Sequence, residues 1–443
     1  MNENSSRFTE KEKSLLLIIL FFSFLIRFFL LFILDPVLRS DSLDYQTLAM
    51  SLLRGEYFLN GKPTAYVSIG YPAFLSGVIY LAGEGQFYIR LVQSVLDTCS
   101  ALIFFGISRK FLTVRNSLIS AALFSLLPSN ILYSQTILSE PLFGFFSMAV
   151  LYLLLNEKFS ESSRYVFFTG LIFGCSVLIR PAYLPVFFLI PLYFFYVRKK
   201  THEVNKNSSA LKYILFFSAG MLLVLAPWSI RNKIMVGTFS PGTTSGINFW
   251  AGSNPAATGT YYLKPDENLP ADYSNEAERD KQYFKLGLDY ALSHPLNYLL
   301  LGIKKTGYLF SSERMIVIYF LESPPGKTST EIYRTAEPWF TLLVNIPYFI
   351  IMILGTWGLM LLRKNRFFIY GSVITWIITV SLFIALSRYH YVLIPFFILG
   401  SVMLIQTGKG FLKEISTAGK IIAALVSLFL LTAWSVEFYL LLK

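Results

Sequence analysis

The stretch SLLLIILFFSFLIRFFLLFILDPVLRSDSLDYQTLAM, residues 14–50, decides the fold class of this chain. It begins with about 20 apolar residues, which is the length that an α-helix needs to cross a bilayer. The apolar run ends near residue 34, and Arg39, Asp41 and Asp44 follow at once. Carboxylates placed there do not help a helix to insert, but the bilayer edge is where chemistry on a lipid-linked substrate needs a base. The stretch therefore predicts a membrane protein with a reactive site at the membrane boundary.

The composition of the whole chain requires an integral membrane protein. Hydrophobic residues make up 54% and charged residues 14% of the 443 residues, and no soluble domain buries that much apolar surface. The formal net charge is +12, but the basic residues form short clusters between apolar segments, so we expect no nucleic-acid binding. Both cysteines, Cys99 and Cys175, lie in apolar segments, and no disulfide framework is expected.

The lengths of the apolar segments predict about eleven transmembrane helices. A proline favours a break between two short halves at Arg180-Pro181. The N-terminal apolar region is longer than that of a signal peptide and is expected to be retained as the first helix. We expect the spans near 14–34, 86–108, 116–133, 137–156, 165–180, 183–197, 212–230, 339–362, 367–386, 391–407 and 421–442.

The distribution of basic residues predicts the orientation of these spans. The clusters at 109–115, 198–206, 363–366 and 409–420 fall on one side, which the positive-inside rule assigns to the cytoplasm. Two long segments, about 35–85 and 231–338, then lie outside and belong to one membrane-embedded domain over 1–443. Interfacial helices are expected in them at about 42–54 (with Ser40 or Asp41 as N-cap and Gly55 as stop), 72–82, 275–292 and 295–312.

Carboxylates at the predicted outer ends are the candidates for acid–base chemistry. Asp41 and Tyr45 stand four apart and share one face of a helix, with Asp44 on a neighbouring face. Glu140 begins the fourth predicted span, before Pro141. Each acidic residue also has a structural interpretation, because Asp41 can cap its helix and a glutamate is common in a first helical turn.

Several arginines recur at the same predicted boundary. Each of them could be a snorkelling anchor, but together they offer fixed positive charge beside the carboxylates, and guanidinium groups suit phosphate oxygens. Arg27 and Asp97 lie instead near the middle of their spans, where we expect them to pair as structural glue. The boundary arginines are Arg90, Arg180, Arg231 and Arg388.

The remaining chemistry is limited by composition. Three scattered histidines and two buried cysteines predict no histidine- or thiol-based metal site. A divalent ion held by Asp41 and Glu140 stays open. Nucleotide-binding and serine-hydrolase motifs are absent from the sequence.

Short motifs in fixed order resemble glycosyltransferases of the C fold over nearly the whole chain. The resemblance is nearest to the bacterial branch related to protein O-mannosyltransferases and to the aminoarabinose transferase that acts on lipid A. The motifs are Asp41-Ser-Leu-Asp-Tyr45-Gln-Thr-Leu-Ala49, Arg54-Gly55, Gly70-Tyr71-Pro72, Leu138-Ser139-Glu140-Pro141, Leu178-Ile-Arg180-Pro181, Pro227-Trp228-x-x-Arg231-Asn232, Asn248-Phe-Trp250-Ala-Gly252-Ser-Asn254-Pro255-x-x-Thr-Gly259 and Ser387-Arg388-Tyr389.

The resemblance implies roles for several of these residues. It makes Asp41 the catalytic aspartate and Glu140 the second acidic residue, and it lets Arg231 and Arg388 hold a polyprenyl phosphate. Relatives usually carry an arginine shortly before Gly-Tyr-Pro, where this chain reads Tyr66-Val-Ser-Ile69, so a phosphate or acceptor contact is either missing here or supplied elsewhere, for example by Lys62. The other polar residues expected to bind substrate and phosphate are Asp44, Tyr45, Tyr71, Arg180 and Tyr389.

Three functions compete on this basis. The first is transfer of a single sugar from a polyprenyl-phosphate donor to a hydroxyl acceptor outside the cytoplasm, with inversion, in what the resemblance suggests is a bacterial inner membrane. The second is a polymerase or ligase that transfers a whole lipid-linked glycan. The third is a transporter, which predicts midplane binding charges and inverted repeats. The sequence favours the first, and it names neither the sugar, the acceptor nor the oligomeric state.

Overall fold

The computed structural model describes residues 8–197, 207–260, 275–322, 324 and 326–442. Within these residues the chain is helical apart from one short antiparallel hairpin, in which β1 (Phe58–Leu59) pairs with β2 (Lys62–Pro63). The predicted all-α class is therefore confirmed.

Six helical segments of the described chain are long and apolar enough to cross a membrane, and a bent pair makes a seventh. The multi-pass prediction is confirmed, whereas the predicted count of eleven is not shown. The six are α1 (Glu10–Ile33), α4 (Gln86–Ser108), α11 (Asn207–Val236), α17 (Pro338–Leu359), the run Ser387–Glu414 with η6 (Ser387–Leu393), α19 (Ile394–Thr407), η7 (Gly408–Gly410) and α20 (Phe411–Glu414), and α21 (Thr417–Leu442).

The bent pair replaces the straight span predicted at 116–133. It consists of α5 (Val114–Leu126) and α6 (Pro128–Ser134), whose axes differ by 56°. Leu127 between them has an extended backbone, with φ −63° and ψ 120°. A residue before proline is disfavoured in the helical region, and the proline has no N–H to continue the helix, so the break falls at Leu127-Pro128.

Shorter apolar helices occupy the other four predicted spans. They have 10–17 residues each, fewer than the roughly 20 that a straight span needs. The break predicted at Arg180-Pro181 is present, since α9 ends at Ile179 and a tighter helical turn follows. The helices are α7 (Glu140–Leu154), α9 (Ser163–Ile179), the series η2 (Pro181–Phe188), α10 (Leu189–Leu192) and η3 (Tyr193–Val197), and α18 (Arg366–Leu382).

Close backbone approach joins several of these helices. A Cβ on Gly170 of α9 would stand 2.2 Å from the carbonyl oxygen of Phe217 in α11, and one on Gly220 of α11 would stand 2.1 Å from that of Phe167 in α9. Only glycine fits at such contacts. Small residues that let backbones touch are the usual basis of helix packing in membranes, where no hydrophobic force joins the helices.

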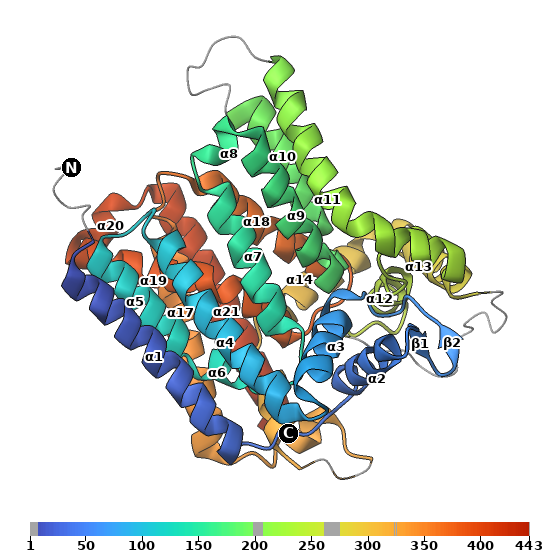
Figure 1. The fold of residues 1–443 in the computed structure, drawn as a ribbon. Coiled ribbons are helices and arrows are strands. Elements are labelled where there is room, and N and C mark those ends of the chain that lie inside the picture. The colour runs from blue at the N-terminus through green and yellow to red at the C-terminus, as the bar shows by residue number, and fades with distance from the viewer. Residues whose placement is uncertain (1–7, 198–206, 261–274, 323, 325, 443) are drawn as a thin grey trace.

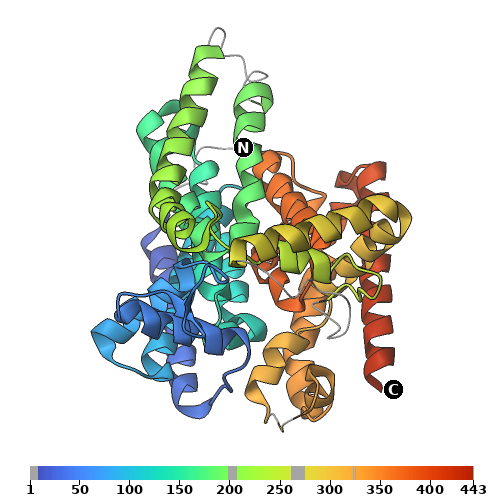
Figure 2. The same ribbon diagram turned by 90° about the vertical axis from the view of Figure 1, so that its right-hand side faces the viewer.

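The two long segments predicted to lie outside the membrane fold into short helices. Figure 1 shows α2, α3 and the hairpin together at one end of the bundle, here named the α2–α3 end, with the N-terminus and α20 at the other. In Figure 2 the blue residues of this end lie across the view from the red C-terminal helices. The segments contain α2 (Asp41–Leu53), α3 (Gly70–Ala82), α12 (Ser245–Ala251), α13 (Glu276–Ser293), α14 (Pro295–Leu309), α15 (Arg314–Val317), η5 (Ile318–Phe320) and α16 (Ser329–Tyr333), while α8 (Lys158–Glu161) joins α7 to α9.

The first of these helices, α2, agrees with its predicted bounds to one residue, and one of its two predicted caps is present. It begins at Asp41, so its N-cap is Ser40, and no side-chain cap hydrogen bond forms there. Gly55 has a φ of +78° just beyond the helix end and stops it as predicted. Because Asp41 is not the cap, its carboxylate is available for another partner.

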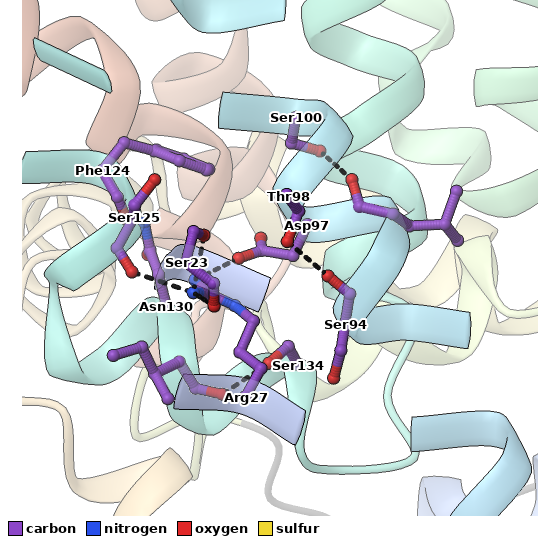
Figure 3. A network of polar contacts seen from close by, with 12 residues as sticks. Ser23, Arg27, Ser94, Asp97, Thr98, Ser100, Phe124, Ser125, Asn130 and Ser134 are labelled. Atoms are coloured by element: carbon purple, nitrogen blue, oxygen red, sulfur yellow. Dashed lines mark hydrogen bonds and ion pairs between the residues drawn. The ribbon is translucent and has the colours of Figure 1, made fainter. Parts of the chain in front are cut away.

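Arg27 of α1 and Asp97 of α4 pair inside the bundle, as predicted (Figure 3). The nitrogen–oxygen distance is 2.5 Å, and neither side chain is exposed to solvent. Arg27 also donates to the carbonyl oxygens of Ser23 and Ser125, both at 2.9 Å. Tyr391 of η6 donates to the other oxygen of Asp97 at 2.7 Å. The pair therefore joins α1, α4, α5 and η6.

Substitution of one partner of this pair should destabilise the fold. Arg27→Met leaves the Asp97 carboxylate buried without its cation, so we expect the free energy of unfolding in mixed micelles to fall by about 3–5 kcal/mol. The double variant Arg27→Met/Asp97→Leu should recover most of the loss. The control is the exposed pair Arg363–Glu414, at 3.3 Å, whose loss should cost less than about 1 kcal/mol. Equal effects at the two pairs would contradict this account.

Candidate active site

Asp41 meets Arg388 at the α2–α3 end, although 347 residues separate them in the chain. Asp41 is the first residue of α2, and Arg388 lies in the tight helical turn η6. Nη2 of Arg388 donates a hydrogen bond to Oδ2 of Asp41. The arginine side chain is 7% exposed and the aspartate side chain 36% exposed. A carboxylate that is partly accessible to solvent is thus held by a buried guanidinium.

Glu140 and Arg180 extend this contact into a cluster. Glu140 is the first residue of α7, where the helix dipole favours a carboxylate, and Arg180 is the C-cap of α9. Nη2 of Arg180 lies 2.5 Å from Oε1 of Glu140, and Nη1 of Arg388 lies 3.5 Å from the same oxygen. Asp41, Arg388, Glu140 and Arg180 therefore alternate in charge, and we name them the ionic cluster.

Hydroxyl and aromatic groups surround the ionic cluster. Ser139 Oγ accepts from Nε and Nη2 of Arg180, both at 3.2 Å, and lies 3.5 Å from the hydroxyl of Tyr45. The ring of Tyr389 lies under both guanidinium groups, with its centroid 5.0 Å from Cζ of Arg180 and 5.5 Å from Cζ of Arg388. Such stacking fixes the planes of the two cations.

A close approach between two motifs brings the cluster together. A Cβ on Gly70, the first residue of α3, would stand 2.6 Å from backbone atoms of Leu178 and Ile179. The glycine therefore lets α3 touch the end of α9 just before Arg180. The adjacent Tyr71 packs edge-on against Tyr45 with centroids 4.8 Å apart, and its hydroxyl donates to Gln93 at 2.6 Å. Tyr71, itself held by Gln93, thus packs against the ring of Tyr45 and limits its movement.

Burial and charge act in opposite directions on Asp41. Burial would raise the pKa of its carboxyl, but the charge of Arg388 and the hydrogen bond from it lower the pKa below its usual value. The pKa of the neighbouring Asp44 is raised, by burial and then by the charge of Asp41. Asp41 is therefore the carboxylate that stays ionised at neutral pH and below.

Three buried polar atoms of the cluster have no hydrogen-bond partner in the described structure. They are Oε2 of Glu140 and both Nε and Nη1 of Arg388. Buried polar atoms are nearly always paired, so orphaned ones ask for an explanation. One acceptor and two donors beside an accessible carboxylate suit a ligand that carries hydroxyl groups and an anionic oxygen.

A divalent ion between Asp41 and Glu140 does not fit this arrangement. The guanidinium of Arg388 contacts both carboxylates and occupies the position between them. In the described residues, no group of three or more His, Cys, Asp or Glu side chains could hold a metal. Both carboxylates of the cluster are already paired with guanidinium groups, so they are poorly placed to bind a metal cation.

Arg231 has a different environment from Arg180 and Arg388. Its Nη1 donates to the carbonyl oxygen of Thr64 at 2.6 Å and its Nη2 to that of Tyr57 at 3.0 Å. Its Cζ lies 4.9 Å from the ring centroid of Trp228 and 5.5 Å from that of Tyr57. These contacts hold the segment around the β1–β2 hairpin, and none of them joins Arg231 to the ionic cluster.

Arg90 is also occupied elsewhere. Its Nη2 donates to the carbonyl oxygen of Leu34 at 2.8 Å and to Gln135 at 3.1 Å, beyond the end of α1.

Sequence reasoning did not single out Ser139 or the buried pair Glu313–His390, with a 3.1 Å separation. Ser139 precedes Glu140 in its motif and His390 follows Arg388 by two residues, and these positions were the available signals.

A comparison with known families bears on this site. Residues 66–230 match the family model described as dolichyl-phosphate-mannose-protein mannosyltransferase. This segment is similar to that family. It contains Glu140 and Arg180, whereas Asp41 and Arg388 lie outside the match. The family resemblance predicted from the sequence is confirmed, and the family consists of membrane glycosyltransferases with lipid-phosphate sugar donors. No curated protein matches the chain by sequence.

One solved structure supports the fold, and a second is similar with a lower TM-score. The apo oligosaccharyltransferase of Archaeoglobus fulgidus has a TM-score of 0.52 and 14% identity, over 97% of this chain and 55% of that chain. The same enzyme, AglB, in complex with an inhibitory peptide and a dolichol-phosphate, has a TM-score of 0.46 and 14% identity, over 96% and 55%. This chain spans about half the length of that enzyme. The likeness to the apo structure supports the glycosyltransferase C fold.

Removal of Arg388 should change the titration of Asp41. In the wild type the pair stabilises the fold fully above the unfolded pKa of about 3.9 and loses this effect as the pH falls through the lower folded value. Arg388→Met leaves burial to act alone, so Asp41 should titrate about 1 to 3 pH units higher. Carbodiimide labelling of Asp41, followed by mass spectrometry from pH 3.5 to 7, measures this. Asp289, exposed on α13, is the reference carboxylate, and an unchanged Asp41 titration would refute the contact.

Arg231→Ala should loosen the hairpin segment rather than the ionic cluster. The carbonyl oxygens of Tyr57 and Thr64 lose their donor, so limited proteolysis within residues 57–65 should become several-fold faster. The Asp41 titration should stay as in the wild type. A shifted Asp41 titration in this variant would show that Arg231 belongs to the cluster after all.

Proposed function

We propose that this protein is a membrane glycosyltransferase that moves a single sugar from a polyprenyl-phosphate donor to a hydroxyl acceptor, with inversion at the anomeric carbon. The observation that carries the proposal is the position of Arg388, which contacts both Asp41 and Glu140 while its Nε and Nη1 have no hydrogen-bond partner. The family of residues 66–230 supports the donor class.

The reaction would be a single displacement. The acceptor oxygen attacks the anomeric carbon, its bond to that carbon forms, and the bond from the carbon to the phosphate oxygen breaks. The acceptor proton passes to Asp41, and the polyprenyl phosphate leaves with the bonding electrons. Arg388 and Arg180 stabilise the negative charge that develops on the phosphate, which is where fixed cations accelerate such a step.

The ion pair of Asp41 gives this step a built-in order. A carboxylate with a lowered pKa is a weak base while Arg388 holds it. A phosphate that binds Arg388 draws positive charge away from Asp41, so the pKa of Asp41 rises when the donor arrives. We infer that Asp41 becomes an effective base only beside a bound donor, while the free oxygen of Glu140 accepts a hydroxyl of the sugar or acceptor.

The membrane arrangement proposed here follows the basic loops. The α2–α3 end faces away from the cytoplasm, so that the site meets donors on the far side of a bacterial inner membrane. The four shorter apolar helices also cross, obliquely or in part, which together with the seven longer segments makes eleven spans. A lipid-linked donor enters from the bilayer, and no nucleotide-binding domain is needed.

Substitution of Asp41 tests the proposal. Asp41→Asn keeps the shape and removes the base, so transfer from a radiolabelled polyprenyl-phosphate sugar should fall by about 10²–10⁴-fold. The assay uses membranes with matched amounts of wild-type and variant protein. Asp289→Asn, on the exposed face of α13, is the matched control and should leave the rate unchanged. Transfer by Asp41→Asn at the wild-type rate would refute the assignment.

The mass of the product distinguishes the proposal from its alternatives. A single-sugar increment on the acceptor supports it, whereas a ladder or a whole glycan would favour a polymerase or ligase. The likeness to an oligosaccharyltransferase concerns the fold alone, so it does not choose between them. Comparison of glycans and glycolipids from cells with and without the gene would identify the sugar and the acceptor together.

A further inference from the structure

Lys305 of α14 is fully buried, although the described structure gives its amine no carboxylate partner. Its side chain has no exposed surface, and its Nζ donates to the carbonyl oxygen of Leu382 at 3.3 Å. The amine also lies 5.0 Å from the ring centroid of Tyr298, which belongs to the same helix. Burying an ammonium group costs free energy unless the group is well paired, so the position of Lys305 needs an explanation.

Lys305 is one of several α14 side chains that form hydrogen bonds with the end of α18. The hydroxyl of Tyr298 donates to the same carbonyl oxygen of Leu382 at 2.7 Å, and Thr306 Oγ1 lies 2.8 Å from Ser381 Oγ. The last carbonyls of a helix carry partial negative charge, which a cation stabilises. The C-terminal turn of α18 is therefore held by three side chains of α14.

The segment that follows this turn leads directly to Arg388. Phe383 has a non-helical backbone, with φ −101° and ψ −102°. The N–H of Ala385 donates to the carbonyl oxygen of Gly259 at 3.2 Å. A Cβ on Gly252 would stand 1.7 Å from the carbonyl oxygen of Phe383 and 3.0 Å from Nζ of Lys305. Residues 382–385 therefore have little freedom to move toward α12 or α14.

Helix α14 also holds the chain on the other side of Arg388. The ring of His390 lies with Nδ1 2.9 Å from the carbonyl oxygen of Leu309, the last residue of α14. Between these two attachments, at Leu382 and at His390, stands Arg388. Its guanidinium reaches Asp41 from a short segment that α14 fixes at both ends.

We propose that Lys305 is a positioning residue for Arg388: its amine fixes the end of α18 so that the guanidinium of Arg388 stays on Asp41. The role in catalysis rests on the proposed function, but the positioning itself does not. Lys305 acts through Arg388 and touches neither carboxylate of the ionic cluster in any contact described above.

Simple packing does not account for the amine. The carbonyl oxygen of Leu382 already accepts the stronger hydrogen bond from Tyr298, so loss of the amine would leave no orphaned acceptor. Burial lowers the pKa of Lys305 to about 8, from an ordinary value of 10.5. The folded state therefore binds fewer protons than the unfolded state between these values, and the charged amine disfavours folding at pH 7. The amine of Lys305 therefore costs stability without satisfying an otherwise unpaired acceptor, which fits a role in positioning Arg388.

The test is carbodiimide labelling of Asp41 in the full-length protein in nanodiscs, followed by mass spectrometry as a function of pH. Lys305→Met keeps the length and removes the amine. We expect the variant to unfold at the wild-type temperature or above, and the Asp41 labelling rate at pH 5 to rise about threefold, equivalent to a titration about half a pH unit higher. Lys304→Met, at the exposed neighbour on α14, is the matched control and should match the wild type.

A double variant identifies the route of the effect. If Lys305 acts through Arg388, Lys305→Met should add nothing to the labelling of Arg388→Met, because the two substitutions remove one shared interaction. Unchanged Asp41 labelling in Lys305→Met, or an undiminished effect in the Arg388→Met background, would overturn the proposal. Tyr298→Phe, which removes the other donor to Leu382, should raise Asp41 labelling in the same direction. Labelling requires neither donor nor turnover, so it answers this question even if Asp41→Asn shows that the proposed transfer reaction is wrong.

Discussion

The guanidinium of Arg388 is the interaction on which the candidate site depends. It is nearly buried, it holds Asp41 through Nη2 and approaches Glu140 with Nη1, and neither Nη1 nor Nε has a hydrogen-bond partner. Two carboxylates this close would repel each other and shift toward protonation without a cation between them. With the cation in place, Asp41 stays ionised and points toward the accessible side. The same cation is the group that an arriving phosphate would compete for, so substrate binding and the basicity of Asp41 are linked through one side chain.

The fold is organised to deliver that side chain. Arg388 follows a non-helical link after α18, and α14 attaches to the chain both before and after it. Glu140 begins α7 and Arg180 ends α9, so the ends of helices, where the backbone carries its own charge, supply the other members of the cluster. Deeper in the bundle, the Arg27–Asp97 pair joins the same region through Tyr391, three residues after Arg388. The Arg27–Asp97 pair is thus connected to the site through Tyr391 of η6.

Sequence reasoning predicted the gathering of charge but not its pairing. Asp41, Glu140, Arg180 and Arg388 all fall at ends of apolar segments, and alternation of sides along the chain places those ends on one face. Which arginine meets which carboxylate depends on how elements hundreds of residues apart pack, and no local pattern encodes that. Arg231 sits in a motif as suggestive as that of Arg388, yet Tyr57 and Trp228 hold it at the hairpin. Composition alone did not predict which spans are bent or shortened, because such a helix has the composition of a span without its length. Lys305 gave no signal, since nothing in an amphipathic stretch reveals that a lysine points inward.

The central claim is that the ionic cluster is where the donor phosphate binds. The most direct measurement is an electron cryo-microscopy structure of the wild-type protein in nanodiscs with a polyprenyl phosphate bound. The account predicts the phosphate within hydrogen-bond distance of the unpartnered nitrogens of Arg388, with the carboxylate of Asp41 beside it. Phosphate density bound at Arg231 instead, with the Arg388–Asp41 contact undisturbed, would contradict it.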